Sequence, residues 1–323
     1  KVIDSGVDVV LLATPPGFRP VHLKAAIDAG KHVFAEKPVA VDAPGVRSVL
    51  ETCERAKQKG LSVVSGLCLR YDNSFRAAVS RIHDGAIGDV HTVQANDYRG
   101  SIWVKPRQPN WTDMEWQMRN WYYFTWLCGD FNVEQHVHFL DVCSWVMKGE
   151  YPVRAVGNGG RQQRTGPEYG HIYDHFSITY EYANGAKLFS NCRQQTGCDN
   201  DMSAHAAGSK GVAHLSERRG GMRIESAGSS WRYEPQPGDR GLYQIEHDEL
   251  FAGIRQGRPI NNGDYMAKST LVAIMGRMAA YTGKAITWQM AMNSKEDLSP
   301  PRYDWDVPLP VPPVAVPGVT KFV

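Results

Sequence analysis

Residues 7–38 have the sequence VDVVLLATPPGFRPVHLKAAIDAGKHVFAEKP. The run VDVVLLA is apolar and rich in β-branched residues without alternation, which is typical of a parallel strand covered by helices on both faces. HLKAAIDA predicts a helix that ends at Gly30, and KHVFAEKP predicts a second strand that ends at Pro38. This order of strand, helix and strand indicates a right-handed parallel β-α-β unit.

The same pattern continues downstream. Asp42 suits the N-cap of a helix that extends to about Gln58, and Gly60 ends this helix. LSVVSGLCLRY, residues 61–71, then predicts a third strand. Three parallel strands joined by two helices form one half of a doubly wound nucleotide-binding sheet.

The other half of such a sheet carries a glycine-rich turn, where a helix N-terminus binds a pyrophosphate. No G-x-G-x-x-G occurs in these 323 residues. Either roughly a hundred further residues precede Lys1, the size of another β-α-β-α-β half, or the protein functions without that half. We expect the first, because an open half-sheet would leave an unpaired edge and an uncovered apolar face.

Short stretches of alternating polarity follow from residue 90 and predict antiparallel strands. The predicted strands are 90–100, 153–163, 174–195 with a hairpin turn at 183–185, 210–216 and 222–226, and the predicted helices are about 132–147, 244–256 and 262–281. The predicted fold class is therefore α/β. Residues 1–90 form the C-terminal half of a dinucleotide-binding domain, a partial doubly wound parallel Rossmann sheet. Residues 91–323 form an α+β substrate and oligomerisation domain with a large, mainly antiparallel sheet and an extended, proline-rich C-terminal tail.

The composition excludes several classes of protein. With 42% hydrophobic and 22% charged residues the chain is an ordinary globular one. The net charge of +2 provides no field for binding nucleic acid. Apolar runs are too short to span a membrane, which needs roughly 20 residues. The six cysteines form no C-x-x-C pair and so indicate neither a disulfide framework nor a cysteine zinc site.

Several motifs together resemble one enzyme family. The run AEKP at 35–38, the preceding DVVLLATPP, the later LSVVSGLCLRYDNSFRAAV and a His-x-x-Asp helix at 138–141 follow one another as in the glucose-fructose oxidoreductase, inositol dehydrogenase and rhizopine-catabolism (Gfo/Idh/MocA) family. The resemblance covers residues 1 to about 290. It implies an oxidoreductase that uses NAD or NADP, with a nucleotide-binding domain and a second domain whose sheet forms the floor of the substrate site.

Lys37 directly follows a parallel strand, at the carboxyl edge where doubly wound folds bind ligands. By resemblance to the family, this lysine contacts the substrate hydroxyl and the nicotinamide ribose, and Glu36 orients the cofactor. Thr14 and Pro15, which follow the first strand, are placed at the cofactor on the same basis. The alternative is a surface lysine at a strand end, paired with Glu36.

Glu134, His138 and Asp141 are spaced at i, i+4 and i+7 and so share one stripe of the predicted helix. This run resembles the family's D-x-x-x-H-x-x-D helix, which implies that His138 is the acid/base, that Glu134 orients it and that Asp141 binds substrate. The sequence has Glu134 where the family usually has Asp, and His136 where it often has Gly. The identity of the substrate therefore does not carry over from known members.

Glu134, His136 and His138 also raise the possibility of a metal site, since carboxylates and imidazoles bind zinc. Positions 136 and 138 are about 200° apart on a helix, so one ion could bind both only if the helix starts later or is distorted. We predict no metal, and we expect His136 to be a hydrogen-bonded residue of the substrate pocket.

Five of the nine tryptophans lie between residues 103 and 126. Their ring faces suit stacking on a sugar, or they fill the core or a subunit interface. Trp116 is our candidate for such stacking, with Tyr98 and Arg99 as further substrate ligands.

These residues support three hypotheses. The first is an NAD(P)-dependent oxidoreductase that transfers a hydride between the cofactor and a sugar or cyclitol hydroxyl. The second is an NAD-dependent glycoside hydrolase that acts by transient oxidation and elimination. The third is a non-redox carbohydrate-binding or metal-assisted scaffold, if the glycine-rich half is naturally absent. The resemblance implies a homodimer or homotetramer, located in the cytoplasm or exported through a twin-arginine signal.

Overall fold

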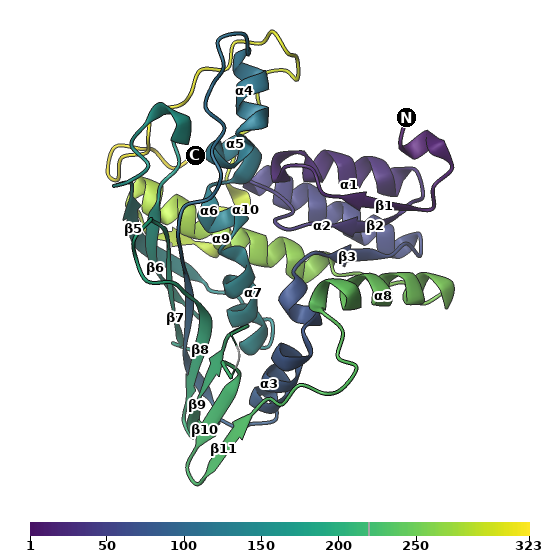
Figure 1. Cartoon of the computed structure of the whole chain (residues 1–323), viewed down its shortest axis with the longest axis vertical. Coiled ribbons are helices and arrows are strands. Elements are labelled where there is room, and N and C mark those ends of the chain that lie inside the picture. Colours follow the sequence, from purple (N-terminus) through teal and green to yellow (C-terminus); the bar gives the residue numbers. More distant parts are fainter. Residues whose placement is uncertain (219) are drawn as a thin grey trace.

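The computed structural model describes residues 1–218 and 220–323. Its first part is a three-stranded parallel sheet of order β1-β2-β3, with β1 at Val9–Leu12, β2 at His32–Ala35 and β3 at Val63–Ser65. Helices α1 (Arg19–Asp28) and α2 (Ala43–Gln58) connect these strands and lie on one side of the sheet (Figure 1). The predicted β-α-β-α-β unit is confirmed.

Local chemistry explains where these elements begin and end. The side chain of Asp42 accepts a hydrogen bond from the backbone N–H of Gly45 at 2.8 Å, which confirms it as the N-cap of α2. The third strand is shorter than predicted, because the chain turns at Gly66 and forms a 3-10 helix, η3, at Cys68–Tyr71. Asp72 then caps α3 (Asn73–His83) through the N–H groups of its first turn.

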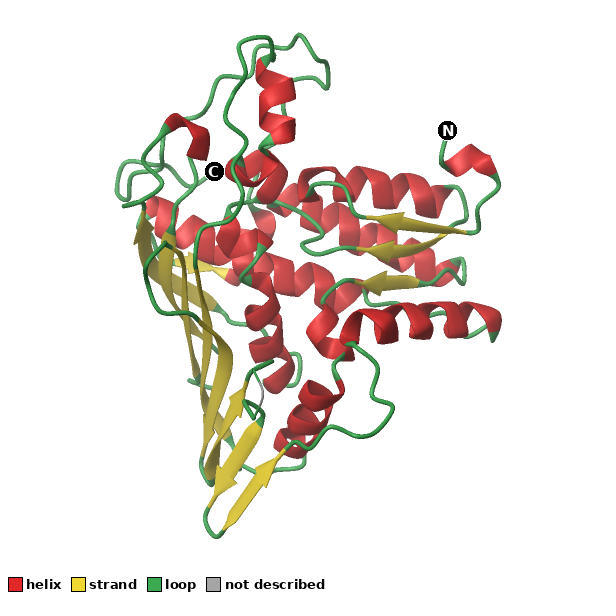
Figure 2. Cartoon of the chain, in the orientation of Figure 1, coloured by secondary structure: helices red, strands yellow, loops and turns green. Residues whose placement is uncertain are grey.

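A second, nine-stranded sheet forms the left edge of the molecule in Figure 2. Its order is β11-β10-β9-β8-β4-β7-β6-β5-β12, and all neighbours are antiparallel except β4 and β7. The strands are β4 (Val90–Arg99), β5 (Arg154–Gly160), β6 (His175–Glu181), β7 (Lys187–Gln194), β8 (Asp201–Gly208), β9 (Gly211–Leu215), β10 (Arg223–Ser226), β11 (Ser229–Arg232) and β12 (Ile286–Thr287). The large, mainly antiparallel sheet is confirmed, whereas β8, β11 and β12 were not predicted.

Helices fill the space between the two sheets (Figure 1). The long helix α9 (Gly263–Thr282) is almost entirely buried and contacts α2, α7 and the strand β5. Gly276 allows its close approach to the large sheet, because a Cβ there would overlap the hydroxyl of Tyr180. That hydroxyl donates to the carbonyl of Val272 at 3.0 Å.

Helix α8 (Leu242–Arg255) lies against the parallel sheet, although it follows the large sheet in sequence (Figure 1). Phe34, Val64 and Tyr71 pack with Leu250 of α8 in a separate buried cluster. Asn262, just before α9, accepts hydrogen bonds from the backbone N–H of Ser65 and from the hydroxyl of Tyr71. Residues 242–262 therefore complete the packing around β3.

The remaining helices are α4 (Asp113–Arg119), α5 (Thr125–Cys128), α6 (Phe131–Glu134), α7 (Val137–Val146) and α10 (Trp288–Asn293). The tail from Ser299 has no helix or strand, and it contacts its own chain. Gln117 donates to the carbonyl of Leu309 at 2.6 Å, and the Tyr173 hydroxyl donates to that of Ala315 at 2.9 Å. Over the described ranges, every helix is too short or too polar for a membrane span.

Candidate active site

The prediction of a single helix at 132–147 is wrong, because the structure has two short helices there, α6 and α7. The chain enters α6 through Gly129 and Asp130, both with positive φ. The buried carboxylate of Asp130 accepts from the N–H groups of Phe131 and Tyr173 at 2.6 and 2.9 Å, and from the hydroxyl of Tyr281 at 2.5 Å. Burial raises the pKa of Asp130 to about 6. The break places Glu134 at the end of one helix and His138 at the start of the next.

Lys37 joins the parallel sheet to this break. Its ammonium donates to the backbone carbonyl of Glu134 at 2.6 Å and to Oε1 of the same residue at 2.9 Å. The two side chains are only 12% and 9% exposed. The structure therefore brings together two of the three predicted catalytic residues, and Lys37 pairs with Glu134 instead of forming the alternative surface pair with Glu36.

His138 lies beside this pair. Burial, followed by the positive charges of Lys37 and Arg99, lowers the pKa of His138 well below its ordinary value. Its Nδ1 is buried and has no hydrogen-bond partner in the described part of the chain. The imidazole is therefore neutral at pH 7 and has a nitrogen lone pair with which to accept a proton. Within the described part of the chain, the side chain of Glu134 bonds Lys37 and not His138. Glu134 therefore positions the lysine.

Arg99, at the end of β4, completes a chain of polar contacts with Lys37 and Glu134. With its amide oriented to satisfy both neighbours, Gln135 donates to Oε2 of Glu134 at 3.1 Å and accepts from Arg99 at 3.0 Å. The Arg99 Nε also donates to buried Asp97 at 2.5 Å. Gln135 and Asp97 were not predicted from the sequence. The signals that could have found them are the E-Q-H run and the alternation that puts residues 97 and 99 on one face of β4.

Tyr98 lies on the opposite face of β4 from Arg99, because neighbouring side chains of a strand alternate. Its ring contacts the guanidinium of Arg193 on the paired strand β7, 4.6 Å from the ring centre. The structure therefore does not bring Tyr98 to the residues around Lys37.

His136 is fully buried between α6 and the large sheet, and its Nε2 is 2.9 Å from the hydroxyl of Ser190 on β7. Burial, and then the charge of Arg99, lowers the pKa of His136 to about 3. It is hydrogen-bonded, as the sequence led us to expect, but it faces the sheet. Over the described residues, no group of three or more histidine, cysteine, aspartate or glutamate side chains could hold a metal ion.

Asp141 lies one turn further along α7, and its carboxylate is fully engaged. Arg70 binds it with two hydrogen bonds of 2.8 and 2.9 Å, and the hydroxyl of Ser269 donates to it at 2.7 Å. A contact between Asp141 and a substrate would require this buried pair to open.

Trp116, in α4, is also placed away from this group. Its indole N–H donates to the carbonyl of Lys105 at 3.3 Å, and its ring packs edge-on against Phe124 at 5.1 Å. None of the hydrogen bonds or ring contacts found for Trp116 in the described residues involves Lys37 or His138.

The carboxyl edge of β1 and β2 presents the four residues predicted at the cofactor. Thr14 is exposed and its hydroxyl is 3.1 Å from His22, while Pro15 precedes a 3-10 helix, η2 (Pro16–Phe18). Glu36 and Lys37 follow β2 and are partly buried. A hydroxyl, a carboxylate and an ammonium at one edge suit the hydroxyls and the amide of a nicotinamide riboside, so these residues fit that end of a dinucleotide.

Two further titratable side chains lie near Glu36 and were not predicted. The pKa of Glu246 on α8 is raised to about 8 by burial and then by the charge of Glu36. The pKa of Cys68 on η3 is raised to about 12, chiefly by burial. Cys68 could have been suspected, because it closely follows β3 at the same sheet edge. Glu246 comes from a distant helix, and no local motif marks it.

Comparison with known proteins places the chain in a family. The family model described as "Oxidoreductase family, NAD-binding Rossmann fold" matches residues 2–65, and that of the GFO/IDH/MocA C-terminal domain matches residues 75–214. The chain belongs to the Gfo/Idh/MocA family of oxidoreductases, as its motifs indicated. Because the Rossmann match spans residues 2–65, the expectation that the glycine-rich half is lacking is not borne out.

Relatives with known names agree with this assignment. The inositol 2-dehydrogenase of Rhizobium meliloti is 26% identical over 273 residues, which cover 79% of this chain and 72% of that protein. The 2,7-anhydro-N-acetylneuraminate hydratase of Escherichia coli is 27% identical over 179 residues, which cover 55% of this chain and 44% of that protein. The chain thus spans less than half of the second relative.

The fold is also that of solved structures. The aldose-aldose oxidoreductase from Caulobacter crescentus, solved as a complex with glycerol, matches with a TM-score of 0.71 and 24% identity. The match covers 88% of this chain and 81% of that one. It confirms the predicted architecture of a parallel sheet followed by a large mixed sheet.

Proposed function

We propose that this protein oxidises or reduces a hydroxyl-bearing carbon of a sugar or cyclitol, with NAD or NADP as the hydride carrier. The proposal rests on the contact of Lys37, at the carboxyl edge of the parallel sheet, with Glu134 at the end of α6, and on His138 just beyond it at the start of α7. Membership in an oxidoreductase family and the names of the relatives support it.

The residues of this chain divide the work at the substrate oxygen. A bound nicotinamide would supply the acceptor for the hydride of the carbinol carbon. Neutral His138 takes the hydroxyl proton, and the ammonium of Lys37 donates a hydrogen bond to the oxygen as negative charge develops there. Glu134 holds Lys37 in place through its carboxylate and its carbonyl. In the reverse direction His138 returns the proton.

The test is to follow reduced-nicotinamide absorbance with NAD or NADP and a panel of cyclitols and aldoses. Formation of reduced nicotinamide with at least one of these, abolished by His138→Ala, is the expected result. His171→Ala is a matched control, because His171 is also a buried histidine but bonds Thr125. A complete lack of reduction across the panel and both dinucleotides would contradict the proposal.

One relative favours a second candidate function. The E. coli relative is named as a hydratase, and transient oxidation followed by elimination or addition needs the same acid/base and cofactor. A chromogenic glycoside separates the two functions. Release of its leaving group without net formation of reduced nicotinamide would support elimination over simple dehydrogenation.

We also propose that two copies of the chain associate through the outer face of the large sheet. Phe189 and Val212 are large apolar residues that lie 43% and 49% exposed on strands of this sheet. Their side chains alternate with the buried residues that face the helices. Mass measurement in solution tests this, since Phe189→Glu should shift the protein towards the monomer.

A further inference from the structure

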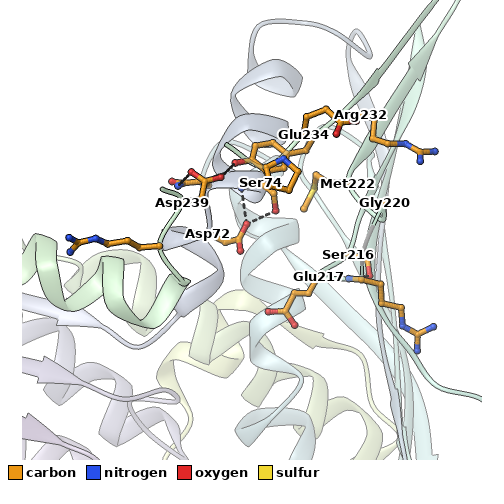
Figure 3. A pocket seen from close by; sticks show the side chains of 14 residues that line it. Asp72, Ser74, Ser216, Glu217, Gly220, Met222, Arg232, Glu234 and Asp239 are labelled. Atoms are coloured by element: carbon orange, nitrogen blue, oxygen red, sulfur yellow. Dashed lines mark hydrogen bonds between the residues drawn. The ribbon is translucent and has the colours of Figure 1, made fainter. Parts of the chain in front are cut away.

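A separate cavity of 590 Å³ lies between the start of α3, the end of β9 and the loop from β11 to α8. Such a volume falls within the roughly 300–1,000 Å³ of small-molecule sites. Asp72, Glu217, Met222, Tyr233 and Glu234 contribute to its wall. Figure 3 shows Glu217 extending from the sheet towards the helices, on the side where Asp72 lies.

The strand register connects this cavity to the candidate active site. Asp97, the partner of Arg99, lies opposite Met202 on β8. Ala204 lies opposite Leu215 on β9, and the hydroxyl of Ser216 donates to the carbonyl of Met202 at 3.0 Å. Continuing that register places Glu217 opposite Met202.

Asp97 and Met202 are paired on β4 and β8, and Glu217 continues this row two residues beyond the end of β9, on the face of the sheet that the helices cover. Burial, and then the charge of Asp72, raises the pKa of the Glu217 carboxyl, whereas the charge of Arg99 acts in the opposite direction. The cavity thus continues the floor that begins at Arg99.

The chemistry of the wall suits a neutral polyhydroxylated ligand. Asp72, Glu217 and Glu234 offer carboxylate oxygens, which accept hydrogen bonds from hydroxyl groups. Tyr233 and Met222 offer apolar surface for the C–H face of a sugar ring. Three arginines also line the cavity, but they do not turn it into an anion pocket. Arg240 is paired with Asp248 at 2.5 Å, and Arg218 donates to the carbonyl of Asn200 at 2.8 Å. The guanidinium of Arg232 points away from the other labelled side chains (Figure 3).

We propose that the cavity beside Glu217 binds a second sugar ring, so that the substrate is a glycoside of at least two rings. One ring lies at Lys37 and His138, and the next extends along the row to Glu217. This inference rests on the proposed function for the position of the reacting ring, and it adds the substrate class and a distal subsite to it.

Isothermal titration calorimetry tests the subsite without requiring turnover. The ligands are cellobiose, lactose and maltose, each compared with glucose and with the methyl glycosides of its component sugars. We expect at least one disaccharide to bind with an affinity about tenfold or more above that of its single-ring counterparts. One hydrogen bond to a charged group is enough to account for a difference of this size. Glu217→Ala should remove this advantage and leave single-ring binding within twofold.

Glu225→Ala is the matched control, because Glu225 is an exposed carboxylate two strands from β8 but projects from the opposite face of the sheet. It should change neither affinity. Equal affinity for disaccharides and their single-ring counterparts, or an advantage that survives Glu217→Ala, would overturn the subsite.

The calorimetric result also stays separate from the redox proposal. Reduction of a dinucleotide by single-ring sugars with no disaccharide preference would overturn the subsite and leave the proposed function standing. A Glu217-dependent preference without any dinucleotide reduction would support the subsite and contradict the proposed redox function.

Discussion

Two ion pairs connect the parallel-sheet region to the helices α6 and α7, and they differ in how completely they are satisfied. Arg70 binds Asp141 with two hydrogen bonds, and Ser269 is a third donor to the carboxylate. The Arg70 guanidinium also lies 4.0 Å from the ring centre of Tyr265. Lys37 touches Glu134 through a single carboxylate oxygen and a backbone carbonyl.

The difference shows which pair can take part in a reaction. A planar guanidinium bound at both ends is fixed in orientation, whereas a lysine ammonium has three rotatable donors on a flexible stem. Lys37 has used two donors, so one remains for a substrate oxygen. Asp141 has no comparable freedom. We therefore expect the Lys37–Glu134 pair to govern catalysis and the Arg70–Asp141 pair to govern stability.

The largest expected effect is on catalysis, at the Lys37–Glu134 pair. Lys37→Met should lower kcat/KM for the proposed oxidation about 10²–10⁴-fold, because the charge that stabilises the developing oxyanion is lost. Initial rates of nicotinamide reduction measure this, and Lys57→Met, at the exposed end of α2, is the control. A Lys37→Met variant with a tenth or more of the original activity would remove the functional difference between the pairs.

At the Arg70–Asp141 pair, a substitution should lower the free energy of unfolding. Asp141→Ala leaves the Arg70 guanidinium without its partner in a mostly buried site, which costs about 3–5 kcal/mol of unfolding free energy. Urea denaturation followed by fluorescence measures the loss. The folded fraction should keep its kcat/KM. A stable variant with greatly reduced turnover would instead place Asp141 in the catalytic machinery.

The pH dependence sharpens the distinction further. The positive charge of Arg99 helps to lower the pKa of His138, so Arg99→Gln should raise that pKa. Because the neutral imidazole is the base, the acidic limb of the kcat/KM profile should move to higher pH, by about 0.5–1 unit. Asp141→Asn should leave the limb in place, because the Asp141 carboxylate is engaged by Arg70 and Ser269. Equal displacement in both variants would argue against this assignment.

The smallest expected effect concerns the third donor to Asp141. Ser269→Ala removes one hydrogen bond to the carboxylate while both bonds from Arg70 remain. The cost should be about 1–2 kcal/mol in the same urea experiment. Ser74→Ala at the half-buried start of α3, where the hydroxyl donates to Asp72, provides a comparison outside the pair. A loss as large as that of Asp141→Ala would mean that Ser269, and not Arg70, satisfies Asp141.

Local sequence chemistry was enough to predict the first sheet and part of the candidate site. Asp42 has a capping side chain, and Lys37 follows an apolar strand, so nearby residues alone determine both positions. The interruption at Gln135 could not be predicted in this way. There the backbone N–H of His136 donates to the carbonyl of Phe131, five residues back, and the imidazole bonds Ser190, a residue far away in sequence.

Periodicity was also insufficient for two substrate candidates. Tyr98 and Arg99 are adjacent in sequence, and their separation onto two faces became clear only once the helices marked the inner face of the sheet. Asp141 shares a helical stripe with His138, but its engagement by Arg70 depends on η3, which was predicted as a continuation of the third strand.

The position of α8 has a consequence for synthesis. Phe34, Val64 and Tyr71 are covered by Leu250, so the apolar underside of β2 and β3 stays exposed while nearly two hundred later residues are translated. Long-range contacts of this kind slow folding and leave an apolar surface exposed, on which other nascent chains can aggregate. The first sheet can reach its final packing only after α8 has left the ribosomal tunnel. Until then, the face of β2 and β3 that α8 covers is a surface to which chaperones can bind.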